Sequence, residues 1–176
     1  GIPPKGNADY AFFQHCISSM DEKNGRCGIL YPNGILERDA EKSMRQKIVE
    51  DDLIECVIGL GKDLFYNSTM ESCLVFCKTN KESSKKGKIL FIDAKEEITR
   101  KKTQSFLEPE HIKKIHDAYK GYKDIPDFAK VVDLDTVRGN DYNLNLRLYV
   151  TDKRYINEEL LKTPLKTYIS KWQESM

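Results

Sequence analysis

The sequence has few of the features that mark membrane, secreted or strongly basic proteins. None of its apolar runs approaches the roughly 18 residues of a membrane span. Its first residues have neither the basic start nor the apolar stretch of a secretory signal. The formal net charge is only +1, so any contact with DNA must come from a local patch of charge. These absences predict a soluble, cytoplasmic protein without a membrane partner.

Cysteine and histidine are too sparse and too scattered for a metal centre or a disulfide framework. The five cysteines are odd in number, none belongs to a C-x-x-C pair, and the three histidines do not accompany them at ligand spacing. The cysteines lie instead in apolar patterns typical of helices and strands. We therefore predict free, buried thiols and no metal site.

Apolar periodicity over residues 1–78 predicts alternating helices and strands. A helical face that includes Phe12 is followed by a strand at residues 27–31. A second helical pattern, starting at Asp39, precedes a near-continuous apolar strand at residues 53–60. The next strand, at 73–78, follows a connection with no helical period, which favours an antiparallel hairpin. This order is typical of a doubly wound α/β fold.

The rest of the chain has a different pattern. Residues 79–88 are polar and rich in lysine, and we interpret them as a basic linker. Residues 89–150 then form an extension, with strands at 89–94 and 131–132 and a helix opened by Pro109. Alternation predicts one more, half-exposed strand through Leu144, Leu146, Leu148 and Val150. Residues 151–176 are predicted to be a helical tail.

Several short motifs occur in the order found in one enzyme family. They are Lys5-Gly6-Asn7-Ala8-Asp9, residues 25–34, Ile58-Gly59-Leu60 with Asp63-Leu64-Phe65-Tyr66, residues 88–94, and Asn140-Asp141-Tyr142-Asn143-Leu144-Asn145. On these motifs, residues 1–150 resemble the methyltransferase (modification, or M) subunit of type I restriction-modification systems. The chain departs from the family pattern at Glu37, where an aromatic is usual, and at Asp39-Ala40, where glycines are usual.

The resemblance implies a fold and an activity. The fold is the second half of a doubly wound, mostly parallel S-adenosylmethionine-dependent methyltransferase sheet, with an antiparallel edge hairpin and an α+β C-terminal extension. The activity is transfer of a methyl group from S-adenosylmethionine to the exocyclic amine of adenine in DNA. The implied partners are DNA, a specificity subunit, a restriction subunit and a second copy of the M subunit.

The same resemblance places the main catalytic elements before Gly1. In this family the glycine-rich cofactor loop and the catalytic Asn-Pro-Pro-aromatic tetrapeptide both precede the part that residues 1–150 match. We therefore expect no catalytic residue in this chain, a cofactor bound mainly by upstream residues, and an isolated fragment without activity.

What the fragment can supply is the far wall of the target-base pocket. An adenine inside a duplex must be swung out of the stack before it can be methylated, and it is then held by an aromatic face and hydrogen bonds. The resemblance places a stacking aromatic in the loop after residue 60, which makes Phe65 and Tyr66 candidates. Asn33 is a third candidate, because it follows a strand at the carboxyl end where open α/β sheets bind ligands.

Two further groups of residues are candidates for weaker reasons. Asp9 and Phe12, on the first helix, are assigned to the cofactor side, although a carboxylate in the first turn also favours the helix dipole. Lys85, Lys86 and Lys88 are candidates for contacts with DNA phosphates, although a solvated loop has the same composition.

Three other functions remain open at this point. One is a stand-alone adenine methyltransferase with its own recognition domain, and another is a non-enzymatic module that docks protein or DNA. A dinucleotide-dependent oxidoreductase has less support, because Gly59-x-Gly61 follows a predicted strand but opens no helix.

Overall fold

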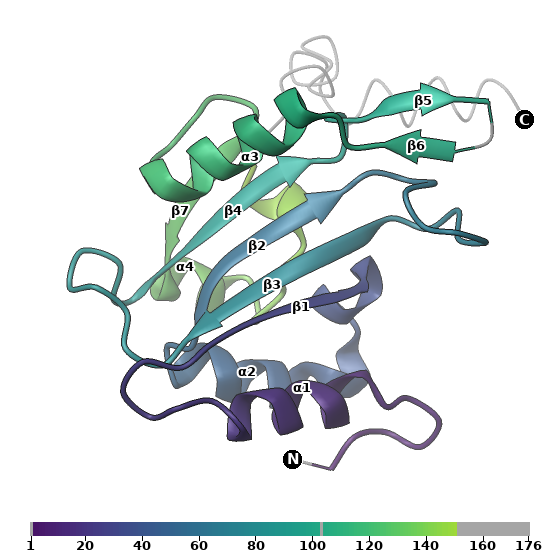
Figure 1. The fold of residues 1–176 in the computed structure, drawn as a ribbon. Helices are drawn as coiled ribbons and strands as arrows, with labels where there is room; N and C mark the ends of the chain where they lie inside the picture. The colour runs from purple at the N-terminus through teal and green to yellow at the C-terminus, as the bar shows by residue number, and fades with distance from the viewer. Residues whose placement is uncertain (1, 103, 151–176) are drawn as a thin grey trace, which may run out of the picture.

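The structure, a computed structural model, describes residues 2–102 and 104–150 and centres on a mixed five-stranded sheet (Figure 1). The strands of this sheet are β1 (Arg26–Pro32), β2 (Ile54–Leu60), β3 (Ser72–Lys78), β4 (Lys88–Ala94) and β7 (Ala129–Asp133). A separate hairpin consists of β5 (Thr99–Lys101) and β6 (Gln104–Phe106). The helices are α1 (Asp9–Ser18), α2 (Lys42–Glu50), α3 (Pro109–Gly121) and α4 (Leu134–Gly139), with 3₁₀ turns at Asn33–Leu36, Asp39–Glu41 and Leu146–Leu148.

The strand order β1-β3-β2-β4-β7 confirms the α/β class. β2 and β3 form the expected antiparallel hairpin, but the prediction that it lies at the sheet edge was wrong: β3 lies between β1 and β2 and pairs antiparallel with both. β2 and β4 are parallel, whereas β7 pairs antiparallel with β4. The α+β extension is therefore continuous with the first sheet strands. How the whole protein divides into domains stays a prediction.

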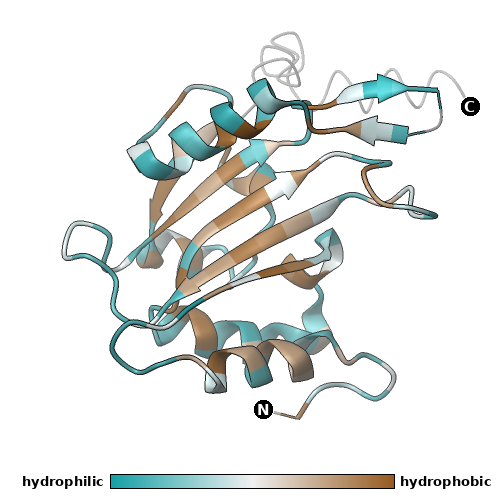
Figure 2. Cartoon of the chain, viewed as in Figure 1, coloured by the Kyte–Doolittle hydropathy of each residue, from teal (hydrophilic) through white to brown (hydrophobic). Residues whose placement is uncertain are grey.

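Two apolar cores fill the faces of the sheet. The larger core lies on the face covered by α1, α2 and α4, and the smaller one lies between the sheet and α3. β2 is buried along its whole length because both faces are covered, which explains its unbroken apolar run. Figure 2 shows apolar residues along the strands and mainly polar residues on the outer side of α3.

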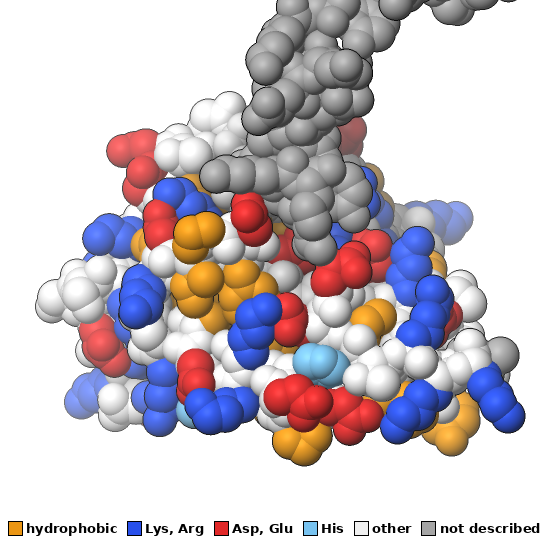
Figure 3. Space-filling model, turned by 90° about the horizontal axis from the view of Figure 1, so that it is seen from above, with side chains coloured by type: hydrophobic (Ala, Val, Ile, Leu, Met, Phe, Trp, Pro, Cys, Tyr) orange, Lys and Arg blue, Asp and Glu red, His pale blue; other side chains and the backbone are white. Residues whose placement is uncertain are grey.

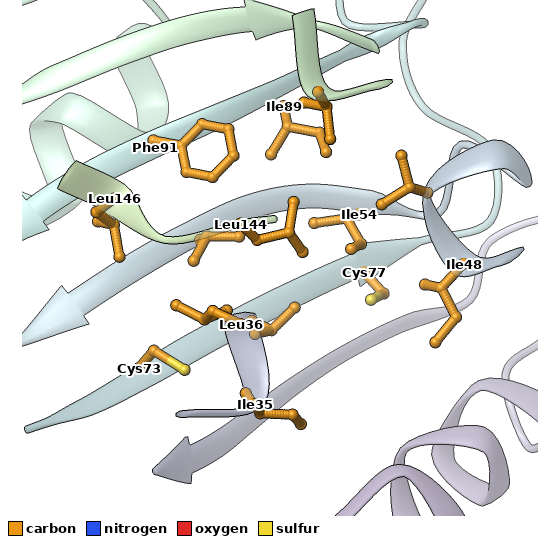
Figure 4. Close-up of a cluster of buried hydrophobic side chains, with 14 of the residues drawn as sticks. Ile35, Leu36, Ile48, Ile54, Cys73, Cys77, Ile89, Phe91, Leu144 and Leu146 are labelled. Atoms are coloured by element: carbon orange, nitrogen blue, oxygen red, sulfur yellow. The ribbon is translucent and has the colours of Figure 1, made fainter. Parts of the chain in front are cut away.

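The last described segment corrects one prediction. Residues 144–150 do not form a strand but fold under the sheet, with a 3₁₀ turn at Leu146–Leu148. The Asn145 side chain accepts a hydrogen bond from the Arg147 amide and caps this turn. Leu144 and Leu146 are buried in the larger core beside Leu36 (Figure 4), whereas Leu148 is half exposed. The alternating leucines therefore reflect the packing of a 3₁₀ turn against the core and not the two faces of a β-strand.

The first helix also differs in detail. Phe12 was assigned to its apolar face but is 65% exposed, and the buried residues are Tyr10 and Phe13. The Tyr10 hydroxyl donates to the Ile35 carbonyl, which fixes the rotation of the helix. The helical tail predicted for residues 151–176 lies outside the described residues.

The basic segment between β3 and β4 is partly buried. The Lys81 ammonium donates to the carbonyls of Ile54 (3.0 Å) and Lys88 (2.8 Å) and forms an ion pair with Asp52. Asp52 in turn accepts from the Gly87 amide. Lys81 thus joins the first residues of the parallel strands β2 and β4, so this segment is part of the sheet's architecture.

The predicted burial holds for three of the five cysteines. All five cysteines are free; Cys56, Cys73 and Cys77 are buried, and Cys16 and Cys27 are partly exposed. No helix in the described part of the chain has the length and apolar character needed to cross a bilayer.

The Lys81 contacts predict an effect on stability. Lys81→Met removes a buried donor to the carbonyls of Ile54 and Lys88 and separates Asp52 from its cation, so the free energy of unfolding should fall by about 2–4 kcal/mol. Lys86→Met, in the same loop but exposed, should change it by less than about 0.5 kcal/mol. Urea unfolding of the two variants measures the difference, and equal stabilities would contradict this account of Lys81.

Candidate functional site

The candidate site lies where three segments meet at one end of the sheet. β1 ends at Pro32, directly opposite Ser72, the first residue of β3. Leu60, at the carboxyl end of β2, also pairs with Ser72. The Asn33 amide extends this contact by donating to the Glu71 carbonyl (3.2 Å). The loop at residues 61–71 is therefore held against the end of β1.

Two adjoining hollows open on the surface at this junction. Both are lined by Pro32, Met70 and Glu71. The first, of about 170 Å³, is also lined by Leu30, Tyr31, Phe65, Ser68 and Ser72. The second, of about 400 Å³, is also lined by Asn33, Gly34, Lys62 and Thr69. The structure thus brings together Asn33 and Phe65, which lie 32 positions apart in the sequence.

The loop geometry separates the two aromatic candidates. Phe65 and Ser68 form an isolated bridge, and Asn67 between them has a φ of 56°. This tight turn leaves Tyr66 near its tip, 88% exposed and outside both hollows. Phe65 is 40% exposed and lines the first hollow, so its ring offers a face to a planar ligand.

Polar atoms in the walls have unused hydrogen-bonding capacity. The Oδ1 of Asn33 and the Oγ of Ser72 are buried and have no hydrogen-bond partner among the described residues. Buried polar atoms are usually paired, so unpaired ones beside a hollow need an explanation. Glu71, by contrast, is held by the Lys95 ammonium at 2.9 Å, which fixes the wall shared by the two hollows.

The walls are poorly suited to acid–base chemistry. Burial raises the pKa of Tyr31, whose hydroxyl donates to the Asp9 carbonyl (3.0 Å) and stays protonated near neutral pH. Burial also raises the pKa of the neighbouring Cys73 thiol to about 12, which keeps it out of the nucleophilic thiolate form. Within residues 2–102 and 104–150, no cluster of His, Cys, Asp and Glu could hold a metal ion. Neither Tyr31 nor Cys73 is therefore in a form that accepts a proton near neutral pH.

The cofactor-side candidates lie beside the same strand end, on α1. The Asp9 carboxylate pairs with the guanidinium of Arg38, which also binds Glu41. Arg38 approaches Gly34 in the wall of the second hollow, so Asp9 is connected to this wall through one side chain. Phe12 projects from the helix into solvent.

The predicted phosphate contacts are not brought to this site. Lys85, Lys86 and Lys88 precede or begin β4, whose first residues lie beside the start of β2, whereas the hollows lie at the end of β2. A seven-residue strand spans about 20 Å, which separates the two regions. Lys85 is also engaged, because it pairs with Glu55 at 3.2 Å.

Sequence reasoning missed several residues at the site. Lys62, Glu71, Ser72 and the anchoring Lys95 have no motif that distinguishes them from ordinary surface residues. The β5–β6 hairpin was missed as well, since its strands are only three residues long. The one available signal was Gly61, which ends the apolar run of β2 and allows the loop to turn close to Lys95.

Comparison with known proteins shows to which family this chain is similar. The N-6 DNA Methylase family matches residues 1–158. Over 155 residues the chain is 43% identical to the type I restriction enzyme MjaVIII methylase subunit of Methanocaldococcus jannaschii, which covers 86% of this chain and 26% of that protein. The chain therefore spans about a quarter of the length of this relative.

Solved structures give the same result. A type I restriction-modification methyltransferase subunit from Streptococcus thermophilus superposes with a TM-score of 0.79 at 36% identity, covering 84% of this chain and 31% of that one. A chain from a structural study of complex assembly in the type I restriction-modification system has a TM-score of 0.64, covering 99% of this chain and 40% of that one. At 18% identity, this second likeness concerns the fold alone.

The close packing at Gly61 predicts that this position does not tolerate a side chain. A Cβ here would lie 2.4 Å from the Lys95 carbonyl oxygen, so Gly61→Ala must displace the loop that lines the hollows. The free energy of unfolding should fall by about 1–3 kcal/mol. Gly139→Ala is the matched control: nothing lies within 4 Å of a Cβ there, and the change should be neutral or stabilising by up to about 1 kcal/mol. Equal losses in denaturant unfolding would contradict the steric argument.

Proposed function

The chain belongs to the N-6 DNA Methylase family, and from this premise we propose that it is the C-terminal part of the catalytic region of a type I restriction-modification M subunit. The whole subunit transfers a methyl group from S-adenosylmethionine to the exocyclic amine of adenine in DNA. The observation that carries this proposal is the pair of hollows at the end of β1, lined by Phe65 and Asn33.

The chain's own residues receive the adenine after it has left the duplex stack. The exposed face of Phe65 stacks on the base, a contact worth about 1–3 kcal/mol and independent of base identity. The Asn33 side chain rotates so that its buried, unpaired Oδ1 reaches the hollow and accepts a hydrogen bond from an N–H of the base edge. Stacking and hydrogen bonding together orient the base. Tyr66 has a lesser role, because its exposed ring lines neither hollow.

The residues present fit one edge of a site for S-adenosylmethionine. Asp9 supplies a carboxylate near the wall of the second hollow, and Phe12 supplies an exposed aromatic ring on the same helix. When bound, the cofactor supplies an electrophilic methyl group on a sulfonium. Asp9 and Phe12 border this cofactor, and the groups that surround it come from the rest of the subunit.

The free edge of β1 supports the view that the rest of the subunit continues this sheet. Among the described residues β1 pairs only with β3, so the backbone groups on its other side lack strand partners. Leu30 of β1 is 43% exposed, beside the first hollow. A strand from the remainder of the protein pairs with this edge and completes the pocket.

The proposed partners follow from the type I assembly to which similar proteins belong. They are DNA, a specificity subunit, a restriction subunit and a second copy of the M subunit, in the cytoplasm. Sequence choice and cleavage then belong to the other subunits, and this chain's task is to hold the target adenine. The rival proposal, a docking module without catalysis, predicts a full-length protein that binds DNA or protein and transfers no methyl group.

Replacing Phe65 tests the stacking role. In the full-length subunit assembled with its specificity subunit, Phe65→Ala should lower kcat/KM for DNA methylation by about 5- to 150-fold, which corresponds to the loss of one stacked base. Phe65→Trp, which keeps an aromatic face, should restore most of it. Transfer of a radiolabelled methyl group to a duplex with a single target adenine measures the rate.

Tyr66→Ala is the matched control for this experiment, since it removes the adjacent aromatic of the same loop. It should alter the rate by no more than about twofold, as expected of an exposed surface residue. Wild-type rates for both alanine variants would exclude the stacking role of this loop. Absence of methyl transfer by the wild-type assembly would overturn the proposed function itself.

Titration calorimetry tests where the cofactor site lies. The full-length subunit should bind S-adenosylmethionine, whereas these 176 residues alone should give no measurable heat of binding, because they supply only one edge of the site. Clear binding by the isolated chain would mean that it contains a complete cofactor site and would overturn the division of the pocket proposed here.

A further inference from the structure

The β5–β6 hairpin carries a basic tip close to the candidate base pocket. Three consecutive cations, Arg100, Lys101 and Lys102, occupy its first strand and its turn. The hairpin lies at the end of the sheet where β2 stops and the loop at residues 61–71 begins (Figure 1). Figure 3 looks down on the molecule and shows Lys and Arg side chains on both sides of this face, including the right, the side on which Figure 1 places the hairpin.

The hairpin is attached to the loop at residues 61–71, which lines the hollows, by two contacts. The Ser105 amide donates to the Asp63 carbonyl at 2.8 Å, and the Arg100 guanidinium pairs with the Asp63 carboxylate. Asp63 is only two residues from Phe65, whose ring lines the first hollow. The basic tip therefore has a fixed position relative to the pocket.

Positive charge is in excess at this rim. The loop 61–71 and the hairpin 99–106 together contain four cations and two carboxylates: Lys62, Arg100, Lys101 and Lys102 against Asp63 and Glu71. Both carboxylates already have cationic partners, Arg100 and Lys95. Lys101 is also engaged, by Glu108 at 3.3 Å and by the Phe106 ring.

Lys62 and Lys102 are the two cations left over. Both side chains are exposed, and neither forms an ion pair or a side-chain hydrogen bond with any described residue. Lys62 lines the second hollow, and Lys102 lies at the hairpin turn with a φ of 54°. Both ammonium groups are therefore available to bind an anion on this side of the hollows.

We propose that Lys62 and Lys102 bind the backbone phosphates on either side of the adenine that enters the pocket. This proposal rests on the proposed function, since it assumes that the hollows receive a base. Phosphate contacts of this kind carry no sequence information but fix the register of the strand on the protein. They complement Phe65, which stacks on any base.

The salt dependence of DNA binding tests this role. In the full-length subunit assembled with its specificity subunit, Lys62→Gln and Lys102→Gln should each reduce the slope of log Kd against log salt by about 0.9, or about 0.7 if the strand is single there. The double variant should lose both contributions. Lys123→Gln is the matched control, because Lys123 is also exposed but follows Tyr122, whose hydroxyl donates to the Lys88 carbonyl at the opposite end of the sheet. Lys86→Gln tests the alternative contact before β4.

A modified duplex locates the contact. Methylphosphonate linkages that remove the charge from the two phosphates flanking the target adenine should weaken binding by the wild-type assembly. The same linkages should cause no further loss in the Lys62→Gln/Lys102→Gln variant, because the interacting charges are already absent. Additive losses would place the two lysines away from these phosphates and would overturn the proposal.

The outcomes separate this proposal from the proposed function. Methylation and DNA binding by the wild type, with unchanged salt slopes in both lysine variants, would overturn the phosphate contacts alone. A reduced slope in Lys86→Gln alone would place the phosphate contact in the segment before β4. This result would also overturn the proposed contacts of Lys62 and Lys102. A wild-type assembly that neither binds DNA nor transfers methyl groups would overturn both.

Discussion

The insertion of β3 between β1 and β2 is the constraint on which the site depends. Antiparallel pairing on both sides of β3 places Ser72 opposite Pro32 of β1 and Leu60 of β2 at once. The loop that joins β2 to β3 is thereby held beside the end of β1. Without this double pairing, Phe65 and Asn33 would belong to separate surfaces. The strand order, more than any single side chain, creates the two hollows.

The two ends of the sheet differ in how their polar groups are satisfied. At the start of β2 and β4, Lys81 and Asp52 link strand ends through buried ionic contacts, and Glu55 accepts from both Lys85 and Tyr119. At the opposite end, Asn33 and Ser72 keep buried oxygens that have no partner within the part of the chain that the structure describes. The polar groups at the first end are satisfied by neighbouring side chains, whereas those at the second end can still accept hydrogen bonds. This difference supports the proposal that the second end binds a ligand.

The sequence was informative where burial imposes a simple pattern. The apolar runs that form β2 and β4 are nearly continuous because these strands are largely buried, so their existence and order followed from periodicity. The strand prediction for residues 144–150 was wrong because a buried 3₁₀ turn and a strand both place alternate leucines inward. The environment of each lysine was harder to predict than the strands. The sequence does not distinguish Lys81, which is buried, from Lys85, which pairs with Glu55, or from Lys102, which is exposed. Only the pairing of distant segments decides which lysines can face a partner.

The chemistry of the walls fits a division of labour across the pocket. Proton transfer would require a group that titrates near neutral pH, yet burial keeps Tyr31 and Cys73 protonated. An aromatic face and an amide oxygen are instead suited to hold a flat, polar base in one orientation. Methyl transfer from an electrophilic donor depends more on the orientation of the accepting base than on a strongly basic side chain. Under the proposed function, a wall that orients the base is sufficient on this side, and we place the reacting groups on the side that continues from the free edge of β1.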